Sequence, residues 1–529
     1  MGEDFFPTVD AGQIRLHVRA PAGTRLEETE RRVDEVEATI REVIPPRDLD
    51  SISSNIGLPI FFNLAFVQTD NIGSQDADVL IALHPEHAPT VDYIRRLRRE
   101  LAQRHPGNKF YFQAADIISQ VLNFGLAAPI DIQVEGNNFN QTFPIALQLE
   151  SMLRSVPGTA DVHIGQVMNF PTLRVEVDRL KAATMGLSQK DVATSMLTSL
   201  ASSSVFAPNF WLNPKNLVNY FVVVQTPQRQ IHDLQTLMQS PITPQAGSSI
   251  RTGLLAKSNI VTGHTTPVVA SRLGDVAEVS RTIRPAVINH YTVQRVIDVL
   301  ANVDGRDLGG VSGDIERKIA TLPKLPPGVA IRIRGQSEAM KQSFGGMGFG
   351  LLLAIVLVYL LIVVNFQSWL DPFIIIMALP GALAGILWML AITGSTLNVS
   401  SFMGAIMAVG VAVANSILIV NFANDMRREG MNAFQAALEA GRVRFRPVIM
   451  TALAMIIGML PMALALGEGG EQNAPLGRAV IGGLLAATIT TLFVVPIVYS
   501  LLRRKPPVSH ELDARFAREI GERLEPDTL

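Results

Sequence analysis

The sequence predicts an α+β water-facing region followed by an all-α bundle of five transmembrane helices. Charged residues make up 17% of the 529 residues, below the ~25% that is usual for soluble proteins, and hydrophobic residues make up 48%. Charge is spread at ordinary density through residues 1–341, whereas residues 344–502 hold long uncharged runs. A soluble part therefore precedes a membrane part.

Charge and residue usage disfavour several function classes. The formal net charge is -2 and no basic patch is interleaved with aromatics, which disfavours nucleic-acid binding. The chain has no cysteine, which excludes disulfides, thiolate nucleophiles and Cys-ligated zinc. No catalytic or nucleotide-binding motif stands in a suitable context, and the nine histidines are scattered singly. We therefore expect no enzyme, no cofactor and no metal site.

Five apolar segments are each long enough to cross ~30 Å of hydrocarbon as a helix. A soluble core would rarely need five such runs in succession. The segments are residues 344–366, 372–393, 402–422, 447–466 and 479–502.

The basic residues in the short connections predict the orientation of these helices. The link between the third and fourth segments and the exit from the fifth are rich in arginine and lysine, so both belong in the cytoplasm. The residues concerned are Arg427, Arg428, Arg442, Arg444, Arg446, Arg503, Arg504 and Lys505. The alternate connections are uncharged or acidic, which places residues 1–341 outside the cytoplasm. Residues 1–20 have no apolar signal segment, so we expect a preceding helix that is missing here.

Small and polar residues mark where the helices should pack. Gly346 and Gly350 form a GxxxG pair, and Gly404, Ala408 and Ala412 form a row that allows close helix contact. Polar groups are costly in lipid, so they should face other helices or a wet path. They are Asn415, Ser416, Asn421, Asn424 and Thr451. Structural packing and ion conduction are both open for them.

The water-facing region begins with a βαββαβ pattern, the order of a ferredoxin-like sandwich. Ile14, Leu16 and Val18 alternate with polar residues as in a half-buried strand, and a helix with a capping box of Thr24 and Glu27 follows. Further strands, a helix from about Val91 and a closing strand near Phe110 complete the unit.

The same unit recurs with an insertion. A strand with Ile130, Ile132 and Val134 alternating with Asp131, Gln133 and Glu135 opens it, and strands and a helix after residue 285 complete it. We expect a first subdomain at residues 1–120, a second at 121–177 and 285–340, an inserted subdomain at 178–284 whose first helix is capped by Ser188, a membrane domain at 341–505 and a tail at 506–529.

An aromatic loop lies between two strands of the first unit. Residues 57–73 contain Phe61, Phe62 and Phe66 with flanking glycines. Such a loop could line a pocket for apolar ligands, or its rings could fold into a core between domains.

Several runs resemble the resistance-nodulation-cell division (RND) efflux transporters. They are NFQSWLDPF from Asn365, NSILIVNFAND from Asn415, RVRFRPVIMTALAMIIGMLPMAL from Arg442, GEGGEQNAPLGRAVIGGLLAAT from Gly467, and the amino-terminal GEDFFPTVDAGQIRLHVRAPAGT. The last resembles the segment after the family's seventh membrane helix. The resemblance covers nearly the whole chain in the correct order.

The resemblance implies the carboxy-terminal half of such a pump. This half would contain two porter subdomains, an inserted docking subdomain and membrane helices eight to twelve. Family members are proton-driven homotrimers of the bacterial inner membrane that work with a periplasmic adaptor and an outer-membrane channel. The resemblance thus implies a multi-pass protein with residues 1–341 in the periplasm and the carboxy terminus in the cytoplasm.

At the proton relay, this sequence resembles the family only in part. The family pairs acidic residues on the fourth helix with a lysine on the tenth and an arginine and a threonine on the eleventh. The motifs place Arg444 and Thr451 at the last two positions, but Ala414 stands where the lysine is expected, next to Asn415. A methyl group cannot compensate a buried carboxylate. Asn415 and Thr451 with an unseen partner would then supply another relay, or coupling is weak.

For the substrate, the separated methionines and the aromatic loop favour lipophilic or amphipathic compounds, as in the multidrug type. Two other classes stay open: a protein-export accessory of the same superfamily, and a nontransporting periplasmic scaffold.

Overall fold

The computed structural model describes residues 2–503 except 8, 59–69, 124–125, 206–207, 228–229, 232, 245–270 and 468. The chain divides into two compact units, each described by itself. One comprises Met1–Val167 with Ala286–Leu529, and the other is Met168–Pro285.

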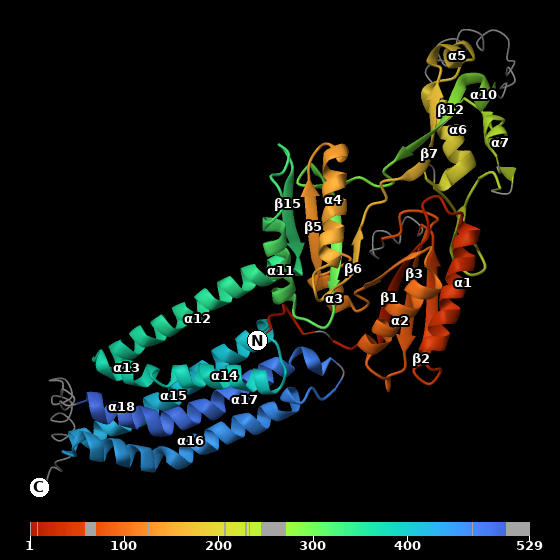
Figure 1. The fold of residues 1–529 in the computed structure, drawn as a ribbon. Helices are drawn as coiled ribbons and strands as arrows, with labels where there is room; N and C mark the ends of the chain where they lie inside the picture. Colours follow the sequence, from red (N-terminus) through yellow and green to blue (C-terminus); the bar gives the residue numbers. More distant parts are fainter. Residues whose placement is uncertain are drawn as a thin grey trace, which may run out of the picture. The chain divides into compact units, whose positions relative to one another are not determined.

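The first sheet of the larger unit has the strand order β2-β3-β1-β4, and every neighbouring pair is antiparallel. This order, with two helices as crossovers, is that of a split βαβ sandwich. The elements are β1 (Gln13–Arg19), α1 (Leu26–Val43), β2 (Leu49–Ile56), β3 (Asp76–Leu83), α2 (Thr90–Arg104) and β4 (Lys109–Gln113). Figure 1 shows α1 and α2 beside β1, β2 and β3.

Strand β1 is buried on both faces. Ile14, Leu16 and Val18 pack with residues of α1 and α2 in one apolar core, as the alternation predicts. The prediction of a half-buried strand is wrong for the other face, where the polar residues are also buried. Their charged partners come from β3, far along the sequence, so the local pattern cannot reveal them.

The capping box predicted for α1 is wrong by one residue. The helix begins at Leu26 with Arg25 at the N-cap position, and Arg25 makes no side-chain cap. The Thr24 hydroxyl donates instead to the carbonyl of Pro21 at 2.7 Å. Glu27 consequently occupies the second helical position, from which it cannot complete the box.

The second sheet repeats the order of the first as β6-β14-β5-β15, with β13 beside another stretch of β14. Its elements are β5 (Ile130–Glu135), α4 (Phe139–Arg154), β6 (Thr159–Ile164), β13 (Asn289–Tyr291), β14 (Gln294–Val303), α11 (Leu308–Ala320) and β15 (Ala330–Gly335), and α3 (Ile117–Leu122) links the two sheets. The strands of this sheet therefore come from two segments of the chain, one before and one after the smaller unit.

The smaller unit is built on a pair of long antiparallel strands, β7 (Phe170–Val177) and β12 (Ala277–Arg284). The structure places β7 here, whereas we expected the insertion to begin at Asp178. Ser188 caps α6 through a capping box with Asp191, as predicted. The other elements are α5 (Arg179–Thr184), α6 (Gln189–Ala201), the 3-10 turn Ser203–Val205, β8 (Asn209–Leu212), β9 (Asn219–Val222), α7 (Leu234–Met238), β10 (Pro241–Ile242), β11 (Ser271–Arg272) and α10 (Leu273–Val276).

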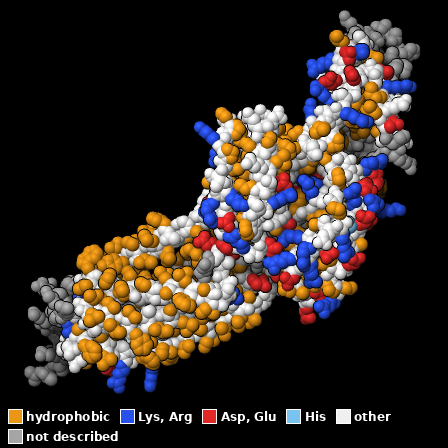
Figure 2. All heavy atoms as spheres, viewed as in Figure 1, with side chains coloured by type: hydrophobic (Ala, Val, Ile, Leu, Met, Phe, Trp, Pro, Cys, Tyr) orange, Lys and Arg blue, Asp and Glu red, His pale blue; other side chains and the backbone are white. Residues whose placement is uncertain are grey.

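The described residues contain five helices long and apolar enough to span a membrane, which confirms that prediction. They are α12 (Gln336–Phe366), α13 (Leu370–Ile376) with α14 (Leu379–Ile392), α15 (Val399–Arg428), α16 (Ala433–Ala463), and α17 (Ala474–Ile489) continued through a π-turn (Thr490–Val494) into α18 (Val495–Leu502); a 3-10 turn, Gly470–Gln472, precedes α17. In Figure 2, hydrophobic side chains crowd the surface over these helices, and charged ones gather over the sheet region.

The ends of two helices differ from the prediction. Arg442, Arg444 and Arg446 lie inside α16 and not in a connection, because α16 begins at Ala433. Asn432 caps it by accepting a hydrogen bond from the amide of Gln435 at 2.8 Å. A run of apolar residues identifies the part of a helix that lies in lipid, but the helix can continue beyond the hydrocarbon into charged sequence.

Close glycine contacts hold α17 against its neighbours. A Cβ placed on Gly404 of α15 would lie 2.7 Å from the carbonyl oxygen of Leu476 on α17, so the predicted small-residue row is a helix contact. Gly385 of α14 and Gly482 of α17 approach each other in the same way. By contrast, nothing described lies within 4 Å of a Cβ on Gly346 or Gly350, so the GxxxG pair makes no contact.

Candidate functional site

A buried polar cluster joins the first turn of α13 to the carboxy-terminal parts of α15 and α18. Asp371 of α13 accepts a hydrogen bond from Asn424 of α15 at 3.3 Å and lies 3.3 Å from the guanidinium of Arg503. Tyr499 of α18 donates to Asn424 Oδ1 at 2.6 Å. Asp371 is 1% exposed, so its charge is compensated inside the bundle. The hydrogen bonds of Asn424 to Asp371 and Tyr499 therefore explain this polar residue as part of the packing between helices.

The structure does not bring the three relay candidates together. Asn415 is buried on α15, whereas Thr451 is exposed on α16 and donates its hydroxyl to the carbonyl of Val448 at 3.0 Å. Arg444 is half-buried, with its guanidinium 5.2 Å from the ring centre of Phe422. No hydrogen bond joins any two of these three candidates in the described structure. Their role in a relay stays a prediction.

One face of α15 is open in this chain. The exposed residues recur every three or four positions, which places them on a single stripe along the helix. The stripe comprises Met403, Met407, Gly410, Ala414, Leu418 and Asn421. Asn415 and Ser416 lie beside it and are buried. The position expected to carry lysine, Ala414, thus faces outward.

Phe61, Phe62 and Phe66, the predicted pocket residues, lie outside the described residues.

A charged network fills the face of the first sheet opposite its helices. Arg15 of β1 contacts Asp78 at 2.8 Å, and Arg19 of β1 contacts Asp76 at 2.6 Å. Between them, His17 lies 2.7 Å from Asp78 through Nδ1 and 3.3 Å from Asp76 through Nε2. All five groups are buried. Three cationic positions on β1 thus meet two carboxylates on β3.

The geometry assigns the charge of His17. An ionised carboxylate can only accept hydrogen bonds, so an imidazole between two carboxylates must donate from both ring nitrogens and is an imidazolium. Burial alone would lower the pKa of His17, but the hydrogen bonds that His17 donates to Asp76 and Asp78 outweigh it and raise that pKa. Burial would raise the pKa of Asp78, yet His17 and Arg15 bring it down to about 2. The network is therefore charged at neutral pH.

The same network reaches the second sheet. Arg19 donates to the carbonyl oxygen of Gly165, just after β6, at 3.0 Å. Tyr111 of β4 stacks between His17 at 4.5 Å and His163 of β6 at 3.7 Å. Burial lowers the pKa of His163 to about 3, so this second histidine is neutral.

Additional polar contacts join the sheets at their edges. Arg98 of α2 pairs with Asp161 of β6 at 2.7 Å, and Asn302 of β14 donates to the carbonyl of Phe112 at 2.6 Å. The two sheets are thus fastened by charged and polar contacts, not by an apolar core alone. Such an interface can change with charge state.

The amino-terminal strap, Gly2–Pro7, bonds to both parts of the larger unit. On one side it pairs with the loop before α15, with the Asp4 amide donating to the carbonyl of Leu397 at 3.0 Å and the Leu397 amide to that of Gly2 at 2.8 Å. On the other side the Gly309 amide, in α11, donates to the carbonyl of Glu3 at 2.8 Å. The strap therefore ties the loop before α15 to α11, which packs in the second sheet's subdomain.

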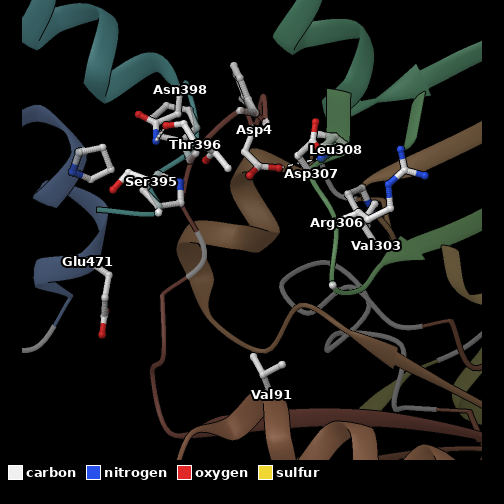
Figure 3. A pocket seen from close by; sticks show the side chains of 18 of the residues that line it. Asp4, Val91, Val303, Arg306, Asp307, Leu308, Ser395, Thr396, Asn398 and Glu471 are labelled. Carbon is white, nitrogen blue, oxygen red and sulfur yellow. Dashed lines mark hydrogen bonds between the residues drawn. The ribbon is translucent and has the colours of Figure 1, made fainter. Parts of the chain in front are cut away.

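The strap lines a cavity of about 680 Å³, drawn in Figure 3. Asp4 accepts a hydrogen bond from the Leu308 amide at 2.8 Å. Burial raises the pKa of Asp4, and the Leu308 amide and Thr396 oppose that rise. Arg478 of α17 also lines the cavity and donates to the hydroxyl of Ser395 at 2.6 Å. The wall carries both signs of charge beside Phe5 and Phe6.

Sequence reasoning missed these networks for a common reason. The alternation in β1 displays Arg15, His17 and Arg19, but nothing local shows that the face they share is covered. Asp76 and Asp78 stand two apart at the start of β3, before the strand that we expected from Val79. The available signal was that their spacing matches the spacing of the opposite charges in β1.

A model of the AcrB/AcrD/AcrF family matches residues 1–503. Among curated proteins, the chain is 27% identical over its whole length to the cation efflux system protein CzcA of Alcaligenes sp. (strain CT14), of which it covers 47%. It is 29% identical to the protein HelA of Legionella pneumophila, with 96% of the chain and 46% of that protein covered. A third relative is the swarming motility protein SwrC of Bacillus subtilis, 29% identical over 72% of the chain and 34% of that protein.

A solved structure gives the same answer. The chain resembles the crystal structure of a heavy metal efflux pump with a TM-score of 0.76 and 26% identity, covering 96% of this chain and 48% of that one. The chain thus spans about half the length of CzcA and of HelA. By its match over residues 1–503, the chain belongs to the AcrB/AcrD/AcrF family of RND transporters.

Proposed function

We propose that the chain is the carboxy-terminal half of an RND pump that exports small solutes across the bacterial inner membrane. The observation that carries this proposal is the family match over residues 1–503, together with coverage of about half of each full-length relative. RND transporters move solutes and are not enzymes, so the chain is not an enzyme.

The open stripe on α15 is the surface on which we place the amino-terminal half. Polar and small residues such as Asn421 and Gly410 are exposed there, although polar groups facing lipid are costly. A partner helix that brings acidic residues would meet Ala414 and could reach Asn415. In this proposal Asn415, Thr451 and Arg444 contribute to proton coupling only when that half is present.

The two sheets would form the porter subdomains and Met168–Pro285 the docking subdomain. We place residues 1–341 in the periplasm and the carboxy terminus in the cytoplasm, following the arginines at the ends of α15 and α18 and in the first half of α16. A homotrimer with a periplasmic adaptor and an outer-membrane channel is the assembly that this layout favours.

Two substrate classes remain. The similarity to the cation efflux system protein CzcA and to a heavy metal efflux pump favours cations, and neither of these relatives supports our expectation of lipophilic compounds. Against cations, the described residues hold no group of three or more His, Asp or Glu placed to bind a metal. We rank cation export first and keep lipophilic compounds as the second class.

A transport assay separates these proposals. The complete pump would be reconstituted in vesicles and tested with zinc, cobalt and a lipophilic dye, with and without a proton gradient. Gradient-driven movement of a metal supports cation export, and movement of the dye alone supports the second class. No movement of either, beside an active control pump, would favour the scaffold or the protein-export accessory. Ala414→Lys should change the pH dependence of transport, and an unchanged profile would sink a role for that position.

A further inference from the structure

Two carboxyl groups, one buried and one half-buried, lie on the polar face of the second sheet. Asp131 of β5 is 0% exposed, and Asp298 lies on the neighbouring strand β14. The side-chain amide of Gln133 lies between them, 2.9 Å from Asp131 Oδ2 and 3.2 Å from Asp298 Oδ1. One nitrogen therefore serves both carboxyl groups.

Asp298 is the member of the pair with more hydrogen-bond donors around it. Besides Gln133, it accepts hydrogen bonds from Gln166 at 2.6 Å and Asn289 at 2.7 Å, both at Oδ2. Three side-chain amides therefore converge on this carboxyl group.

Asp131 has the opposite surroundings. Its Oδ1 is fully buried and has no hydrogen-bond partner in the described structure, and the same holds for Oε1 of Gln133. On the adjacent strands, the residues paired with Asp131 are Leu300, which is apolar, and Arg334. The Arg334 guanidinium is occupied elsewhere, by Glu338 at 3.0 Å and by the ring of Tyr291 at 4.6 Å.

A buried carboxylate with one lone oxygen beside a second carboxylate is unstable, because like charges so close cannot both be ionised in a poorly solvated site. The neutral acid removes both penalties. Burial first, and the charge of Asp298 second, raise the pKa of Asp131 to about 8.

We propose that Asp131 and Asp298 form a buried proton-binding site that holds one proton, on Asp131, at neutral pH. On release, the O–H bond of Asp131 breaks and the proton passes to water or hydroxide, leaving two facing carboxylates. The site lies in the water-facing sheet, away from the membrane relay candidates, and it does not depend on the exported solute.

The site also touches the network of the first sheet. Gln166 donates to Asp298, and the preceding residue, Gly165, accepts from Arg19. Loss of the proton would place a new charge beside Asp298, which Gln166 and Gly165 connect to Arg19 of β1. We therefore expect the contacts that join the two sheets to change when Asp131 loses its proton.

The test is an infrared titration of the full chain purified in detergent, which follows the carbonyl band of a protonated carboxyl. The band should be lost as the pH rises through about 8. Asp131→Asn should remove this titrating band. Asp298→Asn should keep the band. Because this variant removes the neighbouring negative charge, the midpoint of the titration should move to lower pH by about one unit or more. Asp34→Asn, at an exposed position of α1, is the matched control and should change nothing.

Circular dichroism of each variant confirms that it is folded. A titrating band that persists in Asp131→Asn, or its absence from the unchanged chain, would overturn the proposal. Stoichiometric binding of magnesium or zinc at pH 7 that abolishes the band and is lost in Asp131→Asn would also overturn it, in favour of a cation site.

Discussion

The contact between α14 and α17 allows a sharp test of how the membrane bundle packs. A Cβ built on Gly385 would lie 2.3 Å from the Cβ of Ala486 and 2.4 Å from the carbonyl oxygen of Gly482. Ordinary contact begins at 3.4 Å, so Gly385→Ala requires the helices to separate by about 1 Å (3.4 − 2.3). Both obstructing atoms are close to backbone and cannot rotate away. Overpacking of this kind costs about 1–3 kcal/mol.

Gly458→Ala on α16 is the matched control, because nothing described lies within 4 Å of its Cβ. Both variants exchange a helical glycine for alanine, which in itself favours the helix. Denaturant unfolding of the full chain in detergent should therefore show a loss of stability for Gly385→Ala and none for Gly458→Ala. Equal stabilities for the two variants would refute the close α14–α17 contact.

Three further predictions concern the buried polar groups. The folded-state pKa of Asp131 is raised from 3.8 to about 8, so its contribution to stability is greatest below pH ~4 and falls by about 1.4 kcal/mol per pH unit up to about pH 8; unfolding of Asp131→Asn should lack this slope, and an unchanged slope would contradict the assignment. Tyr499→Phe leaves the buried Asn424 Oδ1 without its donor and should cost about 1–3 kcal/mol in detergent unfolding, whereas no loss would show that another group satisfies it. Arg19→Met leaves Asp76 short of a charge partner and should destabilise the chain by about 3–5 kcal/mol; full stability would mean that His17 alone compensates Asp76.

The sequence predicted the elements whose information is local. Alternation placed β1 and β5, and five long apolar runs placed the membrane helices, because strand and helix periods and hydrocarbon thickness are read within a short window. The row at Gly404 was also readable as a contact surface. The partner helix was not, since a small residue permits close approach without specifying what approaches.

What the sequence could not reveal depends on distant partners. The odd-numbered residues of β1 and β5 looked solvent-facing, yet both faces of each strand are buried. Whether Arg19 or Asp131 meets water depends on residues far along the chain, Asp76 and Asp298 among them. Asn424 is similar, because its partners Asp371 and Tyr499 come from two other helices. The burial of a charged side chain can be inferred only when its charge-balancing partners in the fold are known.

The substrate expectation came from a weaker kind of evidence. Separated methionines and an aromatic loop describe composition, not a site, and Phe61, Phe62 and Phe66 lie outside the described residues. The names of the relatives favour cations instead. A site must be argued from converging groups, and the described part of the chain holds no group of three or more His, Asp or Glu that could bind a metal ion.

The most direct test of the central claim is a split-pump assay. This chain would be expressed in a pump-deficient bacterium alone, or together with an amino-terminal RND half that carries the first seven helices, and export of zinc, cobalt and a lipophilic dye would be measured. We expect export only when both halves are present, and we expect the two halves to purify together. Full export by the chain alone, or two halves that associate but move no solute beside an active control pump, would contradict it.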